Sequence, residues 1–282
     1  MDTASHGSNA SHALFALGYM EPTSEAPVGR LSETDTGSGT VIVAEEVPIA
    51  LVYNGRPHVV VMGTPADLED LTVGFSVTES IVANMSGIER VEVVKASHGI
   101  ELQIQISAAD AQRLEARTRS LVSRTSCGLC GIETIKDVLR VPDTLSHSLD
   151  VSREAIFRAG LELSKRQTLN NETSTVHAAA WSSRFGEVLI VREDVGRHNA
   201  LDKVLGAMIR SGVAVDDGFI VVTSRASYEM VQKVAVCGVE LIAAISRPTG
   251  LAIRFAVDAG VTLVGLLRGT SANVYTGPQR IT

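Results

Sequence analysis

The sequence predicts an α/β protein that combines a three-layer domain around a mainly parallel sheet with a smaller α+β domain before it. From about Glu187, short apolar runs alternate with helical stretches of about 10 to 15 residues, which is typical of crossover units in a two-sided sheet. Before that point, strand and helix patterns follow each other without regular alternation. A chain of 282 residues with 45% hydrophobic composition has the length of two domains and can bury a sizeable core.

The N-terminal part divides into a tail and a small domain. Residues 1–40 are rich in Ser, Gly, Thr and Ala and lack an apolar period, which predicts a mobile tail. Order is expected from Val41, so the small α+β domain spans residues 41–122. Within it, β-branched runs flank Asn54-Gly55 and predict a hairpin. Thr64-Pro65 predicts a helix start with a capping threonine and a proline in the first position. Strands at 90–96 and 100–107 and a helix at 108–122 complete the domain.

The C-terminal part is predicted as the three-layer domain. Residues 123–150 form a connecting segment, and residues 151–282 form the α/β domain. Apolar spacing predicts helices at 132–139 and 153–167. Strands are then expected at 187–194, 218–224, 240–246 and 261–268, with helices at 198–212, 227–238 and 251–260 between them.

Composition excludes several classes of protein. No apolar run approaches the ~18 to 20 residues of a membrane span, and the N-terminus lacks the basic start and apolar core of a signal peptide. A net charge of −7 argues against general nucleic-acid binding. Three cysteines are too few for a disulfide framework and fit a reducing compartment. We therefore expect a cytoplasmic protein with no membrane and no nucleic-acid partner.

Four loops that follow predicted strands share one composition. Ligands of open α/β sheets bind outside the carboxyl ends of the strands, where loops and helix N-termini meet. Three of these four loops contain Ser or Thr, including Ser224 and Ser246. The helix N-termini that follow add backbone N–H donors for anionic oxygens. Each loop also has an arginine: Arg197, Arg225, Arg247 and Arg268. This combination indicates a ligand with phosphate groups; the alternative is that these residues only cap helices and face water.

Three polar residues near these loops allow two interpretations each. Asp194 and His198 are candidates for acid/base chemistry, but a carboxylate four positions before a histidine equally suits a helix cap and a partner that holds an imidazole. His177 has small neighbours that would let a ligand approach, and the simpler interpretation is a hydrogen-bonded, partly buried histidine.

The segment SRTSCGLCGIE contains two of the three cysteines, Cys127 and Cys130. A structural zinc site needs four ligands, and here more distant histidines or a partner subunit would have to supply two. A thioredoxin-like dithiol would sit at a strand-to-helix turn, whereas a charged helix precedes this pair. Glycines after each cysteine suit a supple segment, and Arg124 with a following helix N-terminus would favour thiolate. The pair is thus a candidate for sulfur relay, and Cys237 is expected to pack in the core.

Six segments, in order, resemble the FdhD/NarQ family of formate dehydrogenase accessory sulfurtransferases. They read SCGLCG, VHAAAW, REDVGRHNALDKVLG, TSRASYEMVQK, LAIRFAVDAGVTLVGLLRG and NVYT. The resemblance runs from about Val41 to Thr276, and EDVGRHNALDK and SRASYE are its most specific parts. It implies a cytidine-deaminase-like α/β domain with a smaller extra domain, in a homodimer.

The resemblance also implies a cytoplasmic sulfur carrier. Such a carrier accepts sulfur from a cysteine desulfurase as a persulfide and passes it to the molybdenum cofactor, in its bis(molybdopterin guanine dinucleotide) form, before insertion into formate dehydrogenase. By position, Cys127 bears the persulfide and Cys130 is its partner. Guanine nucleotides (GDP or GTP) would mimic the cofactor, and Leu266 stands where the family commonly has an aromatic residue. The predicted cofactor-binding residues are Leu266, Leu267, Arg268, Gly269, Thr270 and Ser271, joined by Arg197, His198, Ser224, Arg225 and Ser246. The alternatives are a cofactor-delivery chaperone without thiol chemistry and a dithiol oxidoreductase.

Overall fold

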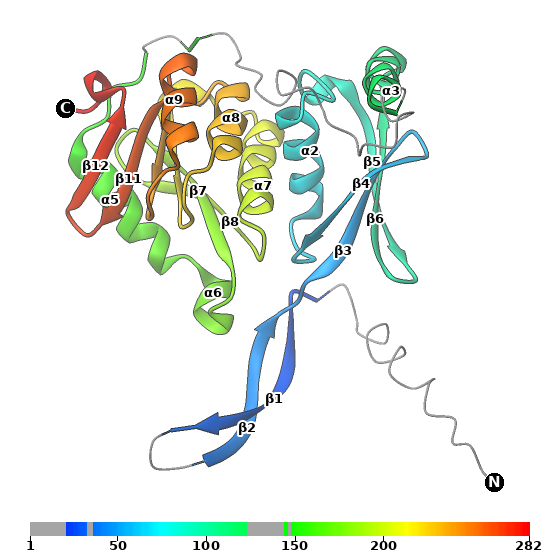
Figure 1. Cartoon of the computed structure of the whole chain (residues 1–282), viewed down its shortest axis with the longest axis horizontal. Coiled ribbons are helices and arrows are strands. Elements are labelled where there is room, and N and C mark those ends of the chain that lie inside the picture. Colours follow the sequence, from blue (N-terminus) through cyan, green and yellow to red (C-terminus); the bar gives the residue numbers. More distant parts are fainter. Residues whose placement is uncertain (1–20, 33–35, 123–143, 146–147) are drawn as a thin grey trace.

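The computed structural model describes residues 21–32, 36–122, 144–145 and 148–282 (Figure 1). Within these residues the strands form a two-stranded ribbon, a four-stranded sheet and a six-stranded sheet. The strands are β1 (Thr23–Leu31), β2 (Thr36–Ala44), β3 (Val47–Tyr53), β4 (Arg56–Gly63), β5 (Ile88–Ala96), β6 (Gly99–Ile106), β7 (His177–Ser183), β8 (Val188–Asp194), β9 (Gly218–Val222), β10 (Leu241–Ala244), β11 (Thr262–Arg268) and β12 (Ser271–Thr276). The helices are α2 (Leu68–Thr78), α3 (Ala108–Val122), α5 (Arg153–Lys165), α6 (Thr168–Thr173), α7 (Arg197–Arg210), α8 (Tyr228–Val236) and α9 (Gly250–Ala259). No helix among the described residues is long and apolar enough to cross a membrane.

The ribbon shows that regular structure begins earlier than the sequence indicated. β1 and β2 pair antiparallel, from Thr23 opposite Ala44 to Leu31 opposite Thr36, so the expected tail boundary at residue 40 falls inside a strand. The ribbon projects from the body of the molecule, with α6 against β2 (Figure 1). Backbone pairing between small polar residues requires no apolar period, which explains why the composition of this stretch did not reveal it.

The four-stranded sheet has the order β4-β3-β6-β5 and confirms most local predictions for this part. Asn54 and Gly55 both have positive φ, 48° and 75°, as a two-residue hairpin turn requires. β5, β6 and α3 lie where they were expected. The predicted start of α2 at Pro65 is wrong: the helix begins at Leu68, after a left-handed Asp67 with φ 52°. Thr64 does not cap it, because the Thr64 hydroxyl oxygen accepts from the Val195 N–H at 3.2 Å instead.

The six-stranded sheet has the order β12-β11-β10-β9-β7-β8. The expected strands β8 to β11 and helices α7 to α9 are confirmed. The mixed α/β class is correct, but a mainly parallel sheet is wrong, because β7 runs antiparallel to both β8 and β9 and β12 runs antiparallel to β11. Parallel pairing joins β10 to β9 and to β11. The likeness to cytidine deaminases stays a prediction.

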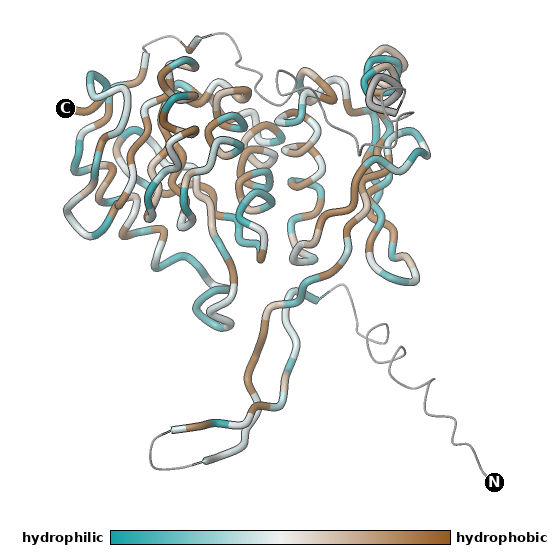
Figure 2. The backbone as a smooth tube through the Cα atoms, in the orientation of Figure 1, coloured by the Kyte–Doolittle hydropathy of each residue, from teal (hydrophilic) through white to brown (hydrophobic). Residues whose placement is uncertain are grey.

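The sheet is covered on both faces. Apolar residues of α7, α8 and α9 pack on one face, and those of α5 pack on the other. Figure 2 shows the apolar residues concentrated in the strands and in the helix faces turned toward them.

Helix α2 connects the two larger sheets by packing against α7. A Cβ atom at Gly74 would lie 1.8 Å from the Asp202 carbonyl oxygen, and one at Gly206 would lie 1.9 Å from that of Asp70, so only glycine permits this approach. The expected division of the chain at residues 122 and 150 stays a prediction, because most of the segment between them lies outside the described residues.

Candidate cofactor-binding site

The carboxyl ends of four predicted strands meet at one edge of the six-stranded sheet. β9, β10 and β11 are mutually parallel neighbours, and β8 runs in the same direction because β7 lies antiparallel between β8 and β9. His177, the first residue of β7, pairs with Asp194, the last residue of β8, and so lies at the same edge. The arginine-containing loops are therefore placed along one side of the domain, as the sequence predicted.

A pocket of ≈ 580 Å³ opens at the β10, β11 and β12 end of this edge. It contains four of the predicted site residues, and it adds Arg247 from the loop after β10 and two residues of β12. Arg247 and Arg268 are both exposed, and neither has an ion-pair partner among the described residues. The full lining is Ser246, Arg247, Leu266, Arg268, Ser271, Ala272 and Asn273. Two unpaired guanidinium groups on one pocket suit phosphate oxygens.

Leu266 has an unusual backbone in this pocket. Its φ is 53°, in the left-handed region that a leucine seldom adopts, and the β11–β12 pairing shifts register between Gly265 and Arg268. Its backbone N–H donates to the Ser246 carbonyl at 3.2 Å, which ties β11 to the loop after β10. At Gly265 a Cβ atom would lie 2.8 Å from Pro248 Cδ. Such local strain is typical of functional sites.

The remaining residues of the LLRGTS stretch lie elsewhere. Leu267 is buried and packs toward α5, where a Cβ atom at Gly160 would contact it at 2.7 Å. Gly269 has φ 56° and forms the β11–β12 turn with Thr270, which lines a separate groove along α5. This stretch thus forms a hairpin turn, and three of its residues, Leu266, Arg268 and Ser271, line the pocket.

A second group of polar residues lies at the β7, β8 and β9 end of the edge. His198 Nε2 is 2.8 Å from Glu229 Oε2 and 3.4 Å from Ser227 Oγ. Burial, and then the charge of Arg197, lower the pKa of both His198 and His177. The Arg197 Nε atom is buried and has no hydrogen-bond partner among the residues that the structure describes. The two histidines are accordingly neutral near pH 7, and Arg197 provides the positive charge.

Asp194 has a structural role. It is fully buried and accepts hydrogen bonds from Lys203 Nζ at 2.6 Å, the Gly196 N–H at 2.7 Å, Asn199 Nδ2 at 3.0 Å and the Thr64 N–H at 3.1 Å. Each carboxylate oxygen accepts two of these hydrogen bonds, so the structure favours the structural interpretation over acid/base chemistry: the carboxylate fixes the corner between β8 and α7.

The loop after β9 has one buried and one exposed residue of the predicted site. Ser224 is buried, and its hydroxyl donates to the Arg225 carbonyl at 3.0 Å, whereas the Arg225 side chain is exposed. Neither residue lines the ≈ 580 Å³ pocket. Asn273 does line it and was missed, since its strand was not predicted; the Gly269-Thr270 pair between two apolar runs was the available turn signal.

Cys127 and Cys130 lie outside the described residues. Just beyond their segment, the Leu145 N–H donates to the Ala259 carbonyl at 3.0 Å and Ser148 N–H donates to the Glu240 carboxylate. Ala259 and Glu240 precede β11 and β10, so this flank lies at the amino edge of the sheet, opposite the pocket. Among the described residues, no three His, Cys, Asp or Glu side chains gather as a metal site.

Cys237 packs against two hydrophobic cores, the one under α7 to α9 and the one of the four-stranded sheet, as expected. Burial, and then the charge of Asp202, raise the pKa of its thiol to about 12.

Comparison with known proteins identifies the family. The sequence matches the FdhD/NarQ family over residues 44–282, which begins where the ribbon ends. A sulfur carrier protein FdhD from Cupriavidus necator is 48% identical over 239 residues, covering 85% of this chain and 83% of that protein. One from Agrobacterium fabrum is 46% identical over 252 residues, covering 89% and 93%. The fold resembles that of a proposed formate dehydrogenase accessory protein from Desulfotalea psychrophila, with TM-score 0.74, 24% identity, and coverage of 93% of this chain and 100% of that one. This chain belongs to the FdhD/NarQ family.

Proposed function

We propose that the protein is a sulfur carrier for formate dehydrogenase maturation. It accepts sulfur from a cysteine desulfurase as a cysteine persulfide and transfers it to the bis(molybdopterin guanine dinucleotide) molybdenum cofactor before the cofactor enters formate dehydrogenase. The observation that supports this most is the pocket at the carboxyl edge, which gathers Ser246, Leu266, Arg268 and Ser271 in a chain related to sulfur carrier proteins.

The chemistry of this pocket suits the nucleotide end of that substrate. The exposed guanidinium groups of Arg247 and Arg268 can each donate two parallel hydrogen bonds to phosphate oxygens, and the hydroxyls of Ser246 and Ser271 lie on the same pocket. Farther along the edge, Arg197 has a buried Nε that no described residue pairs with, which suits another anionic group of the same large molecule. GDP or GTP is the natural probe of this site.

Cys127 is the proposed sulfur-bearing residue. Its thiolate attacks the outer sulfur of the desulfurase persulfide, a new S–S bond forms on Cys127, and the bond in the donor breaks, so the donor cysteine leaves as a thiolate. To release the sulfur, the Cys130 thiolate attacks Cys127 Sγ, the bond to the outer sulfur breaks, and that sulfur leaves as sulfide to the cofactor. A transient Cys127–Cys130 disulfide remains, and a dithiol reductant returns both cysteines to thiols by thiol–disulfide exchange.

The transfer step distinguishes a carrier from a protein that only stores sulfur. A carrier passes labelled sulfur from Cys127 to bound cofactor in a single turnover, whereas a storage protein keeps its label when cofactor is added.

Intact-mass spectrometry tests the carrier role. After incubation with desulfurase and labelled cysteine, the wild-type protein should gain roughly 32 Da per sulfur on the Cys127 peptide. Cys127→Ala should gain no label and should not restore formate dehydrogenase activity. Cys237→Ala is the matched control, because it removes a thiol of high pKa and should load normally. Full loading and full activity of Cys127→Ala would rule out this role.

A cofactor-delivery chaperone without thiol chemistry is the second candidate, since the pocket by itself suits nucleotide binding. It predicts tight guanine nucleotide binding and full maturation activity after Cys127→Ser and Cys130→Ser together. From the family membership we also propose that the protein is cytoplasmic and forms a homodimer. Light scattering of the purified chain tests the dimer.

A further inference from the structure

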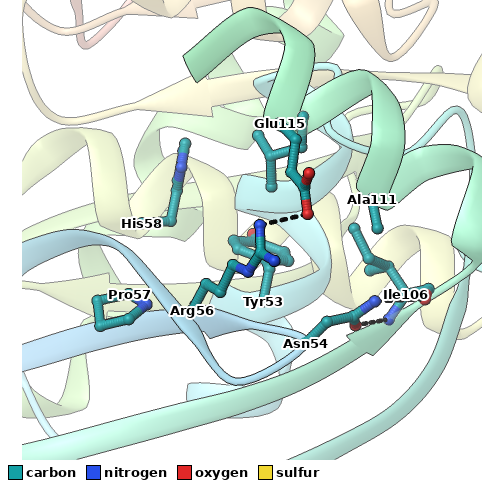
Figure 3. Close-up of a pocket in the computed structure, with 9 residues that line it drawn as sticks. Tyr53, Asn54, Arg56, Pro57, His58, Ile106, Ala111 and Glu115 are labelled. Atoms are coloured by element: carbon teal, nitrogen blue, oxygen red, sulfur yellow. Dashed lines mark hydrogen bonds and ion pairs between the residues drawn. The ribbon is translucent and has the colours of Figure 1, made fainter. Parts of the chain in front are cut away.

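A second pocket, of ≈ 490 Å³, lies between the β3–β4 hairpin and α3, and it shares no residue with the cofactor pocket (Figure 3). Apolar atoms of Tyr53, Pro57 and three residues from β6 and α3 provide most of its wall. The complete lining is Tyr53, Asn54, Arg56, Pro57, His58, Ile106, Ala111, Leu114 and Glu115. Its volume falls within the range of ~300 to 1,000 Å³ typical of binding sites, so it has room for a bulky side chain.

The framework of this pocket is rigid. Asn54 Nδ2 donates to the Ile106 carbonyl at 3.1 Å, and the Ile106 N–H donates back to Asn54 Oδ1 at 2.8 Å, which fixes the hairpin turn to the end of β6. Tyr53 is buried, its hydroxyl lies 2.8 Å from Ser76 Oγ, and its ring meets the His58 ring edge-on at 5.5 Å between centroids. A preformed apolar pocket of this kind is suited to an anchoring side chain.

An ion pair crosses the mouth of the pocket. Arg56 and Glu115 pair across it, as Figure 3 shows, with side chains 71% and 38% exposed. An exposed pair of this type contributes little to stability, about 0 to 1 kcal/mol, so a partner's charged group can replace it at small cost. The mouth therefore offers an arginine to an incoming carboxylate, next to an apolar interior.

The location of this pocket connects it to the proposed chemistry. Its wall α3 ends at Val122, and Cys127 follows five residues later. Because an extended chain advances at most about 3.4 Å per residue, Cys127 lies within about 17 Å of the end of α3. A persulfide is transferred only at bonding distance, so a protein that loads Cys127 has to approach this end of α3.

We propose that the pocket between the β3–β4 hairpin and α3 is the docking site of the sulfur-donating protein, which inserts a bulky apolar side chain and pairs an adjacent carboxylate with Arg56. This inference rests on the proposed sulfur-carrier function and names the surface on which its donor binds. The observations favour the sulfur donor over the cofactor as the occupant of this pocket. The pocket is mainly apolar and has one exposed arginine, Arg56. The cofactor pocket instead has two exposed arginines, and neither has an ion-pair partner among the described residues.

Two variants with matched controls test this site in the full chain. Ala111→Trp fills the pocket, and Ala116→Trp places the same side chain on an exposed position of α3 outside it. Arg56→Glu reverses the charge at the mouth, and Arg90→Glu makes the same change in an exposed pair with Glu92 on β5. Arg56→Glu also covers the case in which Ala111→Trp disturbs folding, since its side chain is exposed.

The readouts are the Kd for cysteine desulfurase and the sulfur loading of Cys127 by glutathione persulfide. We expect Ala111→Trp and Arg56→Glu to weaken desulfurase binding at least tenfold, with both controls within twofold of wild type and loading by glutathione persulfide unchanged in all four. Unchanged desulfurase binding in both pocket variants overturns the docking site. A pocket variant that instead changes the Kd for GDP or the molecular mass in solution also overturns it. If wild-type protein binds desulfurase through this pocket but neither donor loads Cys127, the sulfur-carrier function fails while the docking site stands.

Discussion

The buried Lys203–Asp194 pair allows a quantitative test of how the carboxyl edge is held in place. Both side chains are fully buried, and Lys203 Nζ donates to Asp194 Oδ2 at 2.6 Å and to the Thr64 carbonyl at 3.0 Å. Lys203→Met keeps most of the side-chain volume and removes the charge. It leaves a buried carboxylate without its cation, whereas the Thr64 carbonyl keeps the Ala66 N–H as a donor at 2.8 Å.

The expected loss of unfolding free energy follows from these contacts. Removing one partner of a buried ion pair costs about 3 to 5 kcal/mol. Asp194 keeps its three other donors, from Thr64, Gly196 and Asn199, so we expect the lower end, about 3 kcal/mol. The double variant Asp194→Asn/Lys203→Met removes the uncompensated charge and should lose less than the single Lys203→Met variant.

Urea denaturation followed by Trp181 fluorescence measures this loss directly. Trp181 is the single tryptophan and is buried in β7. Lys95→Met, at an exposed position of β5, is the control and should stay within about 0.5 kcal/mol of wild type. A loss below about 1 kcal/mol for Lys203→Met, or a double variant no more stable than it, would refute the assignment of this pair as the support of the β8–α7 corner.

Three further predictions use other parts of the molecule. Arg268→Ala should weaken GDP binding by about 1.5 to 3 kcal/mol in calorimetry, whereas Arg254→Ala on the exposed face of α9 should not; equal affinities would remove Arg268 from the site. Cys237, with its thiol pKa raised to about 12, should resist iodoacetamide at pH 8 until urea unfolds the chain, and rapid labelling of the folded protein would contradict this. Burial, and then the charge of Arg197, lower the pKa of His177 and His198 in the folded protein. These histidines therefore bind protons more readily in the unfolded chain than in the folded chain. Stability should therefore fall as pH drops below about 6.5, less steeply in His198→Asn, and a Tm that stays level from pH 7 to 5 would show the shifts to be absent.

Local sequence patterns determined much of the fold. β-branched runs located β8 to β11, apolar spacing located α7 to α9, and the Asn54-Gly55 pair specified the β3–β4 hairpin. The arginines after successive strands also indicated a ligand edge, and the sheet order places their loops along one edge. These features depend on residues within one strand, helix or turn, so a short stretch contains the whole signal.

Tertiary structure decided what those patterns left open. β7, rich in small residues, inserts antiparallel between β8 and β9, and only pairing with distant strands shows this. Asp194 resembled a catalytic carboxylate until its contact with Thr64, 130 residues away, showed it buried and saturated. The cofactor pocket likewise combines side chains from β11, β12 and the loop after β10. Burial and long-range pairing set these outcomes because the free energy of a polar group depends on its surroundings, which residues far apart in the sequence create together.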